Sequence, residues 1–233
     1  MDLLTTLYPQ RCVFCDEPVK PGAYVCRACA KAVRPIEGAR CPLCAKPKKL
    51  CDCRGRARFY DEAAAAFLYE GAVRDCIRRW KFGSGGDAAA VLAGAMADCV
   101  RALWPDETFD CAVYVPQTGA ETARRGFNQS RLLARLLGLM LELPVSDALV
   151  KRYTTDRQHS LPMLARTGNV FGVFDCEKRF DGLRVLLVDD IMTTGSTLNE
   201  CAKMLRLADA AQIRCVTAAV AVFHTGGRTE KSD

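Results

Sequence analysis

The segment that most constrains the fold covers residues 183–208, where a hydrophobic run leads into two adjacent carboxylates, a short polar turn and a second apolar pattern. Residues 185–188 are all apolar, which is typical of a strand buried on both faces of a parallel sheet. Apolar residues then recur at helical spacing over residues 196–208. The segment therefore predicts a strand, a turn and a helix in an α/β domain with a central parallel sheet.

The turn between this strand and helix predicts an anion site beside a pair of carboxylates. The first amides of a helix have no partners within the helix, and together with the helix dipole they favour a phosphate group. Asp189 and Asp190 would repel that phosphate, so we expect them to bind ribose hydroxyls or a magnesium ion. A ribose 5-phosphate with a metal-chelated substituent would use all of these groups. The residues expected around its phosphate are Thr193, Thr194, Gly195, Ser196 and Thr197.

This segment resembles the signature of the type I phosphoribosyltransferases, which bind 5-phosphoribosyl 1-pyrophosphate (PRPP). The resemblance implies that Asp189 and Asp190 face the 2- and 3-hydroxyls of the ribose and that residues 193–197 hold the 5-phosphate. It also implies that family's fold, a central parallel sheet with helices on both faces and a small hood. We expect strands near residues 109–115, 145–150, 183–189 and 213–223, and a hood from residues 58–82 and 151–174. An acidic strand end before a capped helix would explain each feature alone, but not the whole run.

A second strand-to-helix turn follows the strand expected near residues 109–115 and precedes a helix expected over residues 121–142. In type I phosphoribosyltransferases the corresponding turn holds the pyrophosphate, so the resemblance assigns this role to Gln117, Thr118 and Gly119. The turn lacks the leucine and the basic residue that are usual in the family. Pyrophosphate binding, and with it turnover, therefore stays open.

Residues 151–174 form a basic, polar stretch, which at this length in a compact domain is either a functional lid or a segment without regular structure. In type I phosphoribosyltransferases a flexible loop at this place closes over the reacting centre and excludes water. The resemblance makes its arginines candidates for neutralising the leaving group. They are Arg152, Arg157 and Arg166.

Eight of the fourteen cysteines fall within residues 12–53. No signal peptide is evident at the N-terminus, and such density in a reducing compartment favours metal over disulfides. The first four have the spacing of a zinc ribbon, whereas the second four end in Cys-x-Cys, so ligation by the last two and the pairing between sets stay open. A module of residues 1–57 is too small for an apolar core, so zinc would supply most of its folding energy. The two sets are Cys12, Cys15, Cys26 and Cys29, and Cys41, Cys44, Cys51 and Cys53.

The formal charge of +6 is concentrated between Arg40 and Arg58, where seven basic residues accompany one acidic residue. A zinc module ringed by lysine and arginine would neutralise the phosphates of nucleic acid. A solvated basic surface is the alternative, because no aromatic side chains are interleaved for stacking. The candidate nucleic-acid contacts are Lys46, Lys48, Lys49, Arg54, Arg56 and Arg58.

The chain as a whole resembles the ComF family, in which a double zinc ribbon precedes a phosphoribosyltransferase domain and which is associated with DNA uptake in natural transformation. The resemblance divides the chain into a ribbon module of residues 1–57 and a transferase-like domain of residues 58–233. Departures are the Cys-x-Cys pair, Ser160 in place of a glycine, and the turn of residues 116–119. The matching segments are the cysteine pairs from Cys12, the Arg-Gly-Phe-Asn-Gln-Ser run of residues 125–130, the spaced pattern of residues 158–174, and residues 188–197.

The resemblance implies a PRPP-binding protein that acts in DNA uptake, with magnesium-dependent phosphoribosyl transfer as its candidate reaction. One alternative is a non-catalytic PRPP sensor whose ribbons bind single-stranded DNA, a competence helicase or another DNA-processing protein. Another is a nucleobase salvage enzyme, although no base-recognition segment follows the strand of residues 213–223. No apolar run approaches the roughly 20 residues of a membrane span, and we expect a cytoplasmic location.

Overall fold

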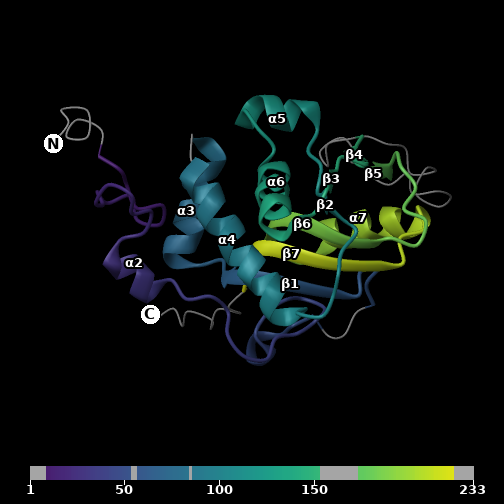
Figure 1. Ribbon diagram of the computed structural model, residues 1–233, viewed down its shortest axis with the longest axis horizontal. Helices are drawn as coiled ribbons and strands as arrows, with labels where there is room; N and C mark the ends of the chain where they lie inside the picture. The colour runs from purple at the N-terminus through teal and green to yellow at the C-terminus, as the bar shows by residue number, and fades with distance from the viewer. Residues whose placement is uncertain (1–8, 54–56, 84–85, 153–172, 223–233) are drawn as a thin grey trace, which may run out of the picture.

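The computed structural model describes residues 9–53, 57–83, 86–152 and 173–222. Within these ranges the centre of the molecule is a five-stranded sheet of order β1-β7-β6-β2-β3, and all neighbouring strands are parallel (Figure 1). The predicted parallel sheet is therefore confirmed, with β6 at its centre. Its strands are β1 (Glu62–Leu68), β2 (Cys111–Tyr114), β3 (Val145–Ser146), β6 (Arg184–Met192) and β7 (Gln212–Val220).

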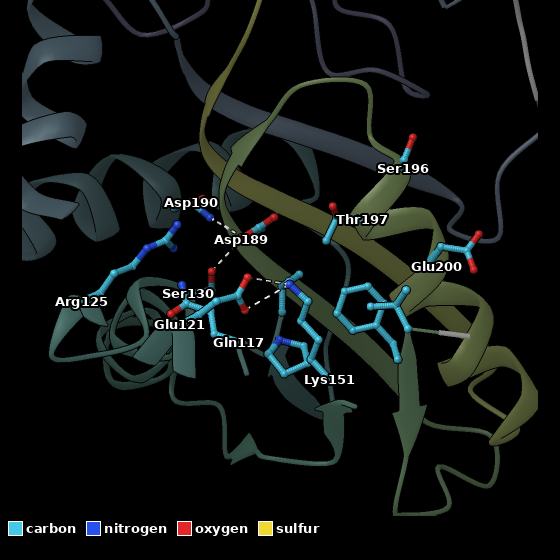
Figure 2. Close-up of a pocket in the computed structure, with 14 residues that line it drawn as sticks. Gln117, Glu121, Arg125, Ser130, Lys151, Asp189, Asp190, Ser196, Thr197 and Glu200 are labelled. Carbon is cyan, nitrogen blue, oxygen red and sulfur yellow. Dashed lines mark hydrogen bonds and ion pairs between the residues drawn. The ribbon is translucent and has the colours of Figure 1, made fainter. Parts of the chain in front are cut away.

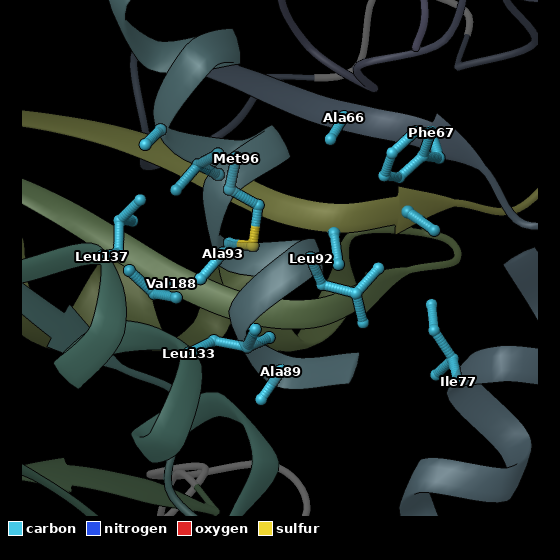
Figure 3. Close-up of a cluster of buried hydrophobic side chains, with 14 of the residues drawn as sticks. Ala66, Phe67, Ile77, Ala89, Leu92, Ala93, Met96, Leu133, Leu137 and Val188 are labelled. Carbon is cyan, nitrogen blue, oxygen red and sulfur yellow. The ribbon is translucent and has the colours of Figure 1, made fainter. Parts of the chain in front are cut away.

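Helices cover both faces of the sheet, because successive side chains of a strand point to opposite faces. Leu186 and Val188 of β6 belong to one apolar cluster, together with side chains of α4 and α6 (Figure 3). Val185 and Leu187 belong to a second cluster, which includes the buried face of α7. The helices are α2 (Arg27–Ala32), α3 (Gly71–Phe82), α4 (Gly86–Leu103), α5 (Gly119–Arg125), α6 (Gln129–Leu141) and α7 (Ser196–Leu207), with a 3₁₀ turn η1 (Lys48–Leu50).

Two predicted elements are each divided in the structure. The helix expected over residues 121–142 is α5 followed by α6, because Gly126 adopts a left-handed conformation (φ 82°) that ends α5. Asn128 then caps α6 by accepting a hydrogen bond from the backbone of Arg131. The strand expected over residues 145–150 divides into β3 and β4 (Leu149–Lys151), and β4 pairs antiparallel with β5 (Phe174–Cys176) in a separate small sheet.

The prediction that residues 58–82 belong to a hood is wrong. Residues 62–68 form β1, the edge strand of the main sheet, and α3 packs beside α4 (Figure 1). The alanine-rich segment is a strand because its alternating residues are buried on both faces, which outweighs the helix propensity of alanine. Of the predicted loop of residues 151–174, residues 153–172 lie outside the described residues.

The cysteine-rich segment packs directly on the domain. Its second half covers the free edge of β1, where the backbone N–H of Ala63 donates to Pro42 O (2.6 Å) and that of Ile36 donates to Ala66 O (2.8 Å). Its first half packs on α3 through Phe14, which lies edge-on to Phe67 of β1 at 6.1 Å between ring centroids. An unpaired strand edge invites aggregation, so this covering protects the sheet. The boundary at residue 57 stays a prediction.

Replacement by alanine is expected to have opposite effects on stability at two helical glycines, Gly138 and Gly94. A Cβ added at Gly138 of α6 would lie 2.7 Å from Leu143 O and 2.8 Å from Val145 Cγ2, whereas a Cβ at Gly94 of α4 meets open space. We expect Gly138→Ala to lower the free energy of unfolding by about 2–3 kcal/mol through the forced shift of the α6–β3 turn. Gly94→Ala is expected to raise it by up to about 1 kcal/mol. Denaturant unfolding of both variants checks this, and equal effects would contradict the packing described.

Candidate functional site

The eight cysteines of residues 12–53 form two separate clusters. Each set of four has ligand atoms within 4.8 Å of one another, in the order in which the cysteines occur along the chain. The Sγ atoms of Cys51 and Cys53 lie 3.5 Å apart, and that of Cys53 lies 3.7 Å from Cys41 Sγ. Zinc–sulfur bonds of about 2.3 Å in a tetrahedron require sulfur separations of roughly 3.8 Å. Both clusters therefore fit a zinc ion, and the Cys-x-Cys pair is no obstacle in the second.

The thiols of each cluster have unequal acidity. Burial alone would raise the pKa of Cys12, but hydrogen bonds from the backbone N–H groups of Cys26, Cys15 and Phe14 lower it to about 6. Burial and the neighbouring thiols raise the pKa of Cys29. One thiol of the cluster therefore ionises readily, whereas further ionisation is unfavourable because the negative charges repel one another. A bound zinc ion would compensate this charge and allow the other thiols to lose their protons.

Metal content tests the second cluster directly. We expect two zinc ions per chain in the purified protein and one in a Cys53→Ser variant, because removal of one of four ligands opens the coordination shell. Cys176→Ser is the matched control, since Cys176 lies outside both clusters, and it should retain two ions. Elemental analysis by mass spectrometry measures the ratio; two ions in Cys53→Ser would exclude this residue as a ligand.

A cleft of about 450 Å³ opens beside the carboxyl ends of β2 and β6, where open α/β sheets bind their ligands. Figure 2 shows Asp189, Ser130 and Glu121 on one side of the cleft and Ser196, Thr197 and Glu200 of α7 on the other. Ten of the fourteen lining residues are polar or charged. The lining residues are Val115, Pro116, Gln117, Glu121, Arg125, Ser130, Lys151, Val173, Phe174, Asp189, Asp190, Ser196, Thr197 and Glu200.

The two predicted carboxylates lie inside β6, which extends three residues beyond Asp189 to Met192. Asp189 is 8% exposed and Asp190 is 9% exposed. Asp189 Oδ1 accepts hydrogen bonds from Ser130 Oγ (2.7 Å) and from the backbone N–H of Asp190 (2.9 Å). Asp190 Oδ2 forms an ion pair with Lys81 Nζ at 2.6 Å. Burial and the charge of Asp190 raise the pKa of Asp189 to about 7.

The turn after β6 has the shape expected of a phosphate loop. Gly195 precedes α7 as its N-cap with a left-handed backbone (φ 75°), a conformation that favours glycine, and a Cβ there would lie 2.6 Å from Met192 Cε. Thr194 Oγ1 lies 2.9 Å from Ser196 Oγ. Ser196 and Thr197 line the cleft, whereas Thr193 and Thr194 are exposed beside it. The predicted strand, turn and helix therefore occur together around one point.

The second turn contributes one of its three predicted residues to the cleft. Gln117 lines it, and its Nε2 donates to Oε1 of the buried Gln129 at 2.9 Å. Thr118 caps α5 instead: its Oγ1 accepts from the backbone N–H of Glu121 at 3.2 Å, and its own N–H donates to the Glu121 carboxylate at 2.8 Å. Gly119 is exposed at the start of α5 and is not a lining residue.

The run of residues 125–130 explains how α6 serves the site. Arg125 lines the cleft, and its Nε is buried without a hydrogen-bond partner among the described residues. Gln129 holds Gln117, and Ser130 holds Asp189. In the sequence, this run is recognisable only as a family signature. Its local signal is Asn128, a residue type that commonly caps helices, followed by Gln129 and Ser130 at the start of α6.

The predicted loop arginines have separate outcomes. Arg152 forms an ion pair with Asp175 (2.6 Å) beside the small sheet and does not line the cleft. The neighbouring Lys151, which the sequence did not single out, lines the cleft and pairs with Glu121 at 2.8 Å. The other candidates, Arg157 and Arg166, lie outside the described residues.

The predicted basic surface is smaller than the sequence indicated. Lys46 is 2% exposed and pairs with Asp52 at 2.6 Å, so its assignment as a nucleic-acid contact is wrong. Lys48 and Lys49 are exposed on η1. Arg58 lies against the turn of residues 193–197, where its guanidinium donates to Thr194 O at 2.9 Å. The remaining candidates, Arg54 and Arg56, lie outside the described residues.

Comparison with known families agrees with both parts of this structure. The double zinc ribbon domain matches residues 3–65, and the phosphoribosyl transferase domain matches residues 122–233. The chain thus combines a double zinc ribbon with a phosphoribosyl transferase domain, as the resemblance to the ComF family predicts, and its relatives include proteins named for competence and DNA utilization. It is 26% identical to competence protein ComFC of Bacillus subtilis over 198 residues, which cover 80% of each protein.

Two shorter matches have higher identity. Competence protein F of Haemophilus influenzae is 42% identical over 87 residues, which cover 36% of this chain and 38% of that protein. DNA utilization protein YhgH of Escherichia coli K12 is 37% identical over 106 residues, 45% of this chain and 47% of that protein. These matches thus span less than half of either relative.

Solved structures with a similar arrangement include an allosteric regulatory enzyme of purine biosynthesis, with 20% identity and a TM-score of 0.40 over 56% of this chain and 25% of that one. A purine phosphoribosyltransferase from Pyrococcus horikoshii has 17% identity and a TM-score of 0.33 over 58% of this chain and 81% of its own. Among the residues described here, none of the helices has both the length and the apolar character needed to span a bilayer.

The raised pKa of Asp189 predicts how the stability of the protein depends on pH. Because its folded-state pKa is raised, the folded chain keeps a proton between about pH 4 and pH 7 that the unfolded chain has released. This stabilisation is complete below about pH 4 and is lost as the pH rises through 7. Asp189→Asn lacks the buried charge, so its melting temperature should exceed that of the wild type by a few degrees near pH 8, and the difference should narrow toward pH 5.

The control for this pH dependence is Asp147→Asn. Asp147 is an exposed carboxylate whose pKa is lowered by its ion pair with Lys178, so its linkage has the opposite sign. Thermal melts of the three proteins at several pH values provide the measurement. A difference between Asp189→Asn and the wild type that is constant with pH would contradict the buried, partly protonated carboxylate.

Proposed function

We propose that the cleft binds PRPP with a magnesium ion and that the protein acts in DNA uptake or utilisation. The observation that carries the first part is the pairing of two buried carboxylates with a glycine-centred helix N-terminus across one cleft. Carboxylates repel a phosphate, so a ligand that binds both the carboxylates and the helix N-terminus must carry hydroxyls at one place and a phosphate at another. A ribose 5-phosphate has this arrangement.

The ribose would lie against β6. Asp189 is oriented by Ser130 and by the N–H of its neighbour, which leaves its second oxygen to accept a hydrogen bond from a ribose hydroxyl. Asp190 is balanced by Lys81 in the free protein. The 5-phosphate would then reach the first amides of α7 and the hydroxyls of Ser196 and Thr197.

The pyrophosphate would lie toward α5 and α6. The turn of residues 116–119 has no basic residue, but Arg125 and Lys151 line the same cleft. Arg125 Nε has no hydrogen-bond partner within the described part of the chain, and Lys151 is held in place by Glu121. These cations support binding of a highly charged leaving group. The carboxylates of Glu121, Asp190 and Glu200 offer the hard oxygen ligands that suit magnesium, which would neutralise pyrophosphate charge when bound.

As an enzyme, the protein would transfer the phosphoribosyl group. The bond between C1 and the pyrophosphate oxygen breaks, pyrophosphate leaves with the electron pair, and a nitrogen of the acceptor donates a pair to C1 and loses a proton to solvent. The residues of the cleft would position the reactants and stabilise the separating charges. Val173 and Phe174 add an apolar wall, and the chemical identity of the acceptor stays open.

The role in DNA handling is supported by the relatives, two of which are named for competence and one for DNA utilization. A second candidate function uses the same pocket as a PRPP sensor, with the zinc ribbons as an adaptor for single-stranded DNA or a helicase. The exposed Lys48 and Lys49 favour this candidate. A cytoplasmic location belongs to both proposals, because zinc thiolates persist where thiols stay reduced. A nucleobase salvage enzyme is a third candidate, which the relatives named for competence and DNA utilization do not favour.

Calorimetric titration of the zinc-loaded protein with PRPP and magnesium tests the proposal. We expect the wild type to bind PRPP and an Asp189→Asn/Asp190→Asn variant to bind it at least tenfold more weakly. Neutral amides accept weaker hydrogen bonds from the ribose hydroxyls than charged carboxylates do. Asp147→Asn serves as the surface control and should bind like the wild type.

The titration also separates the candidate functions. Binding followed by pyrophosphate release with a nitrogenous acceptor supports the transferase. Binding with no release for any acceptor, together with retention of a single-stranded oligonucleotide by the PRPP-loaded protein, supports the sensor. No binding of PRPP by the wild type overturns the proposed site.

A further inference from the structure

We infer that Arg58 is a ligand of the 5-phosphate and that the second zinc cluster holds it in place. The inference rests on the proposed PRPP site and extends it to a residue outside the transferase signature. Residues 193–197 contain no basic side chain, so helix amides and hydroxyls alone would otherwise bind a phosphate dianion. The structure brings an arginine from more than a hundred residues away to this loop.

The position of Arg58 fits this role. One terminal nitrogen donates to Thr194 O at 2.9 Å, and the same nitrogen lies 3.7 Å from where a Cβ on Gly195 would be. Its Nε is buried and has no hydrogen-bond partner among the described residues. A guanidinium has five N–H donors in a planar fork, so the contact with Thr194 leaves donors for a phosphate bound at the loop.

Tyr60 links this arginine to the second zinc cluster. Its hydroxyl donates to Leu43 O at 2.6 Å and lies 3.2 Å from the Cβ position of Gly195. The backbone N–H of Leu43 is in turn hydrogen-bonded to the Cys41 thiol. One residue of the zinc knuckle therefore bonds to a metal ligand with its N–H and to Tyr60 with its carbonyl, so loss of zinc would release the support beneath the phosphate loop.

The segment that carries Arg58 is also fixed to α7. The N–H of Phe59 donates to Asn199 Oδ1 at 2.9 Å, and Arg206 Nε donates to Phe59 O at 3.0 Å. One terminal nitrogen of Arg206 also donates to both carboxylate oxygens of Asp61, each at 2.7 Å. These bonds set the segment against the helix whose N-terminus would bind the phosphate. Arg58 is thus preorganised, which reduces the entropy lost on binding.

The test uses three probes: PRPP with magnesium, ribose 5-phosphate, and pyrophosphate with magnesium. In zinc-loaded Arg58→Gln we expect the affinity for PRPP and for ribose 5-phosphate to fall by the same factor, about 10- to 100-fold. The affinity for pyrophosphate should be unchanged. Arg34→Gln is the matched control, because Arg34 is an exposed arginine of the cysteine-rich segment whose guanidinium donates to Lys31 O, and it should bind like the wild type.

Tyr60→Phe tests the link to the zinc cluster, since it keeps the ring and removes only the hydroxyl. We expect two zinc ions per chain to remain and ribose 5-phosphate affinity to fall about 3- to 10-fold. Unchanged affinity in this variant would overturn the link, and wild-type affinity of Arg58→Gln for ribose 5-phosphate would overturn the assignment of Arg58. If the wild type binds ribose 5-phosphate but not PRPP, the proposed function fails. The role of Arg58 is then still decided by the ribose 5-phosphate affinity of Arg58→Gln relative to the wild type. If the wild type binds neither, both fail.

Discussion

The burial of two adjacent carboxylates in β6 is the constraint on which the site depends. Asp189 and Asp190 leave water almost completely, and a buried charge costs several kcal/mol unless it is paired or hydrogen-bonded. Ser130 of α6 and Lys81 of α3 provide this compensation. Both helices are therefore positioned by polar bonds at the cleft as well as by the apolar cluster beneath it. A pair kept at such a cost is consistent with a ligand that needs both charges.

The cysteine-rich segment is part of the same structure. Its second half covers the edge of β1 and supports Tyr60 through Leu43. Its first half is held by Arg79 of α3, whose guanidinium donates to the carbonyls of Val13 and Phe14. Lys81, which pairs with Asp190, follows two residues later on that helix. Free energy from metal binding would thus stabilise the transferase-like domain as well as the ribbons.

Local patterns predicted the elements that carry the chemistry. The apolar run of β6, its carboxylates, the hydroxyl-rich turn and the helix after it were all readable, because each depends on residues close together in the chain. The paired cysteines predicted both clusters for the same reason. The break at Gly126 had a readable signal, a glycine followed by a capping asparagine. That the alanine run of β1 joins the main sheet had no such signal, because strand pairing is set by tertiary packing.

The sequence by itself determined the α/β class, the succession of strand, turn and helix around Asp189, and the two sets of clustered cysteines. Only the tertiary structure decided which distant side chains meet in and around the cleft: Lys81 beside Asp190, Lys151 beside Glu121 and Arg58 beside Thr194. Periodicity tells which face of an element is buried, but it does not encode the strand order β1-β7-β6-β2-β3. That order brings the ends of distant elements together, and buried charges then select the partners within reach.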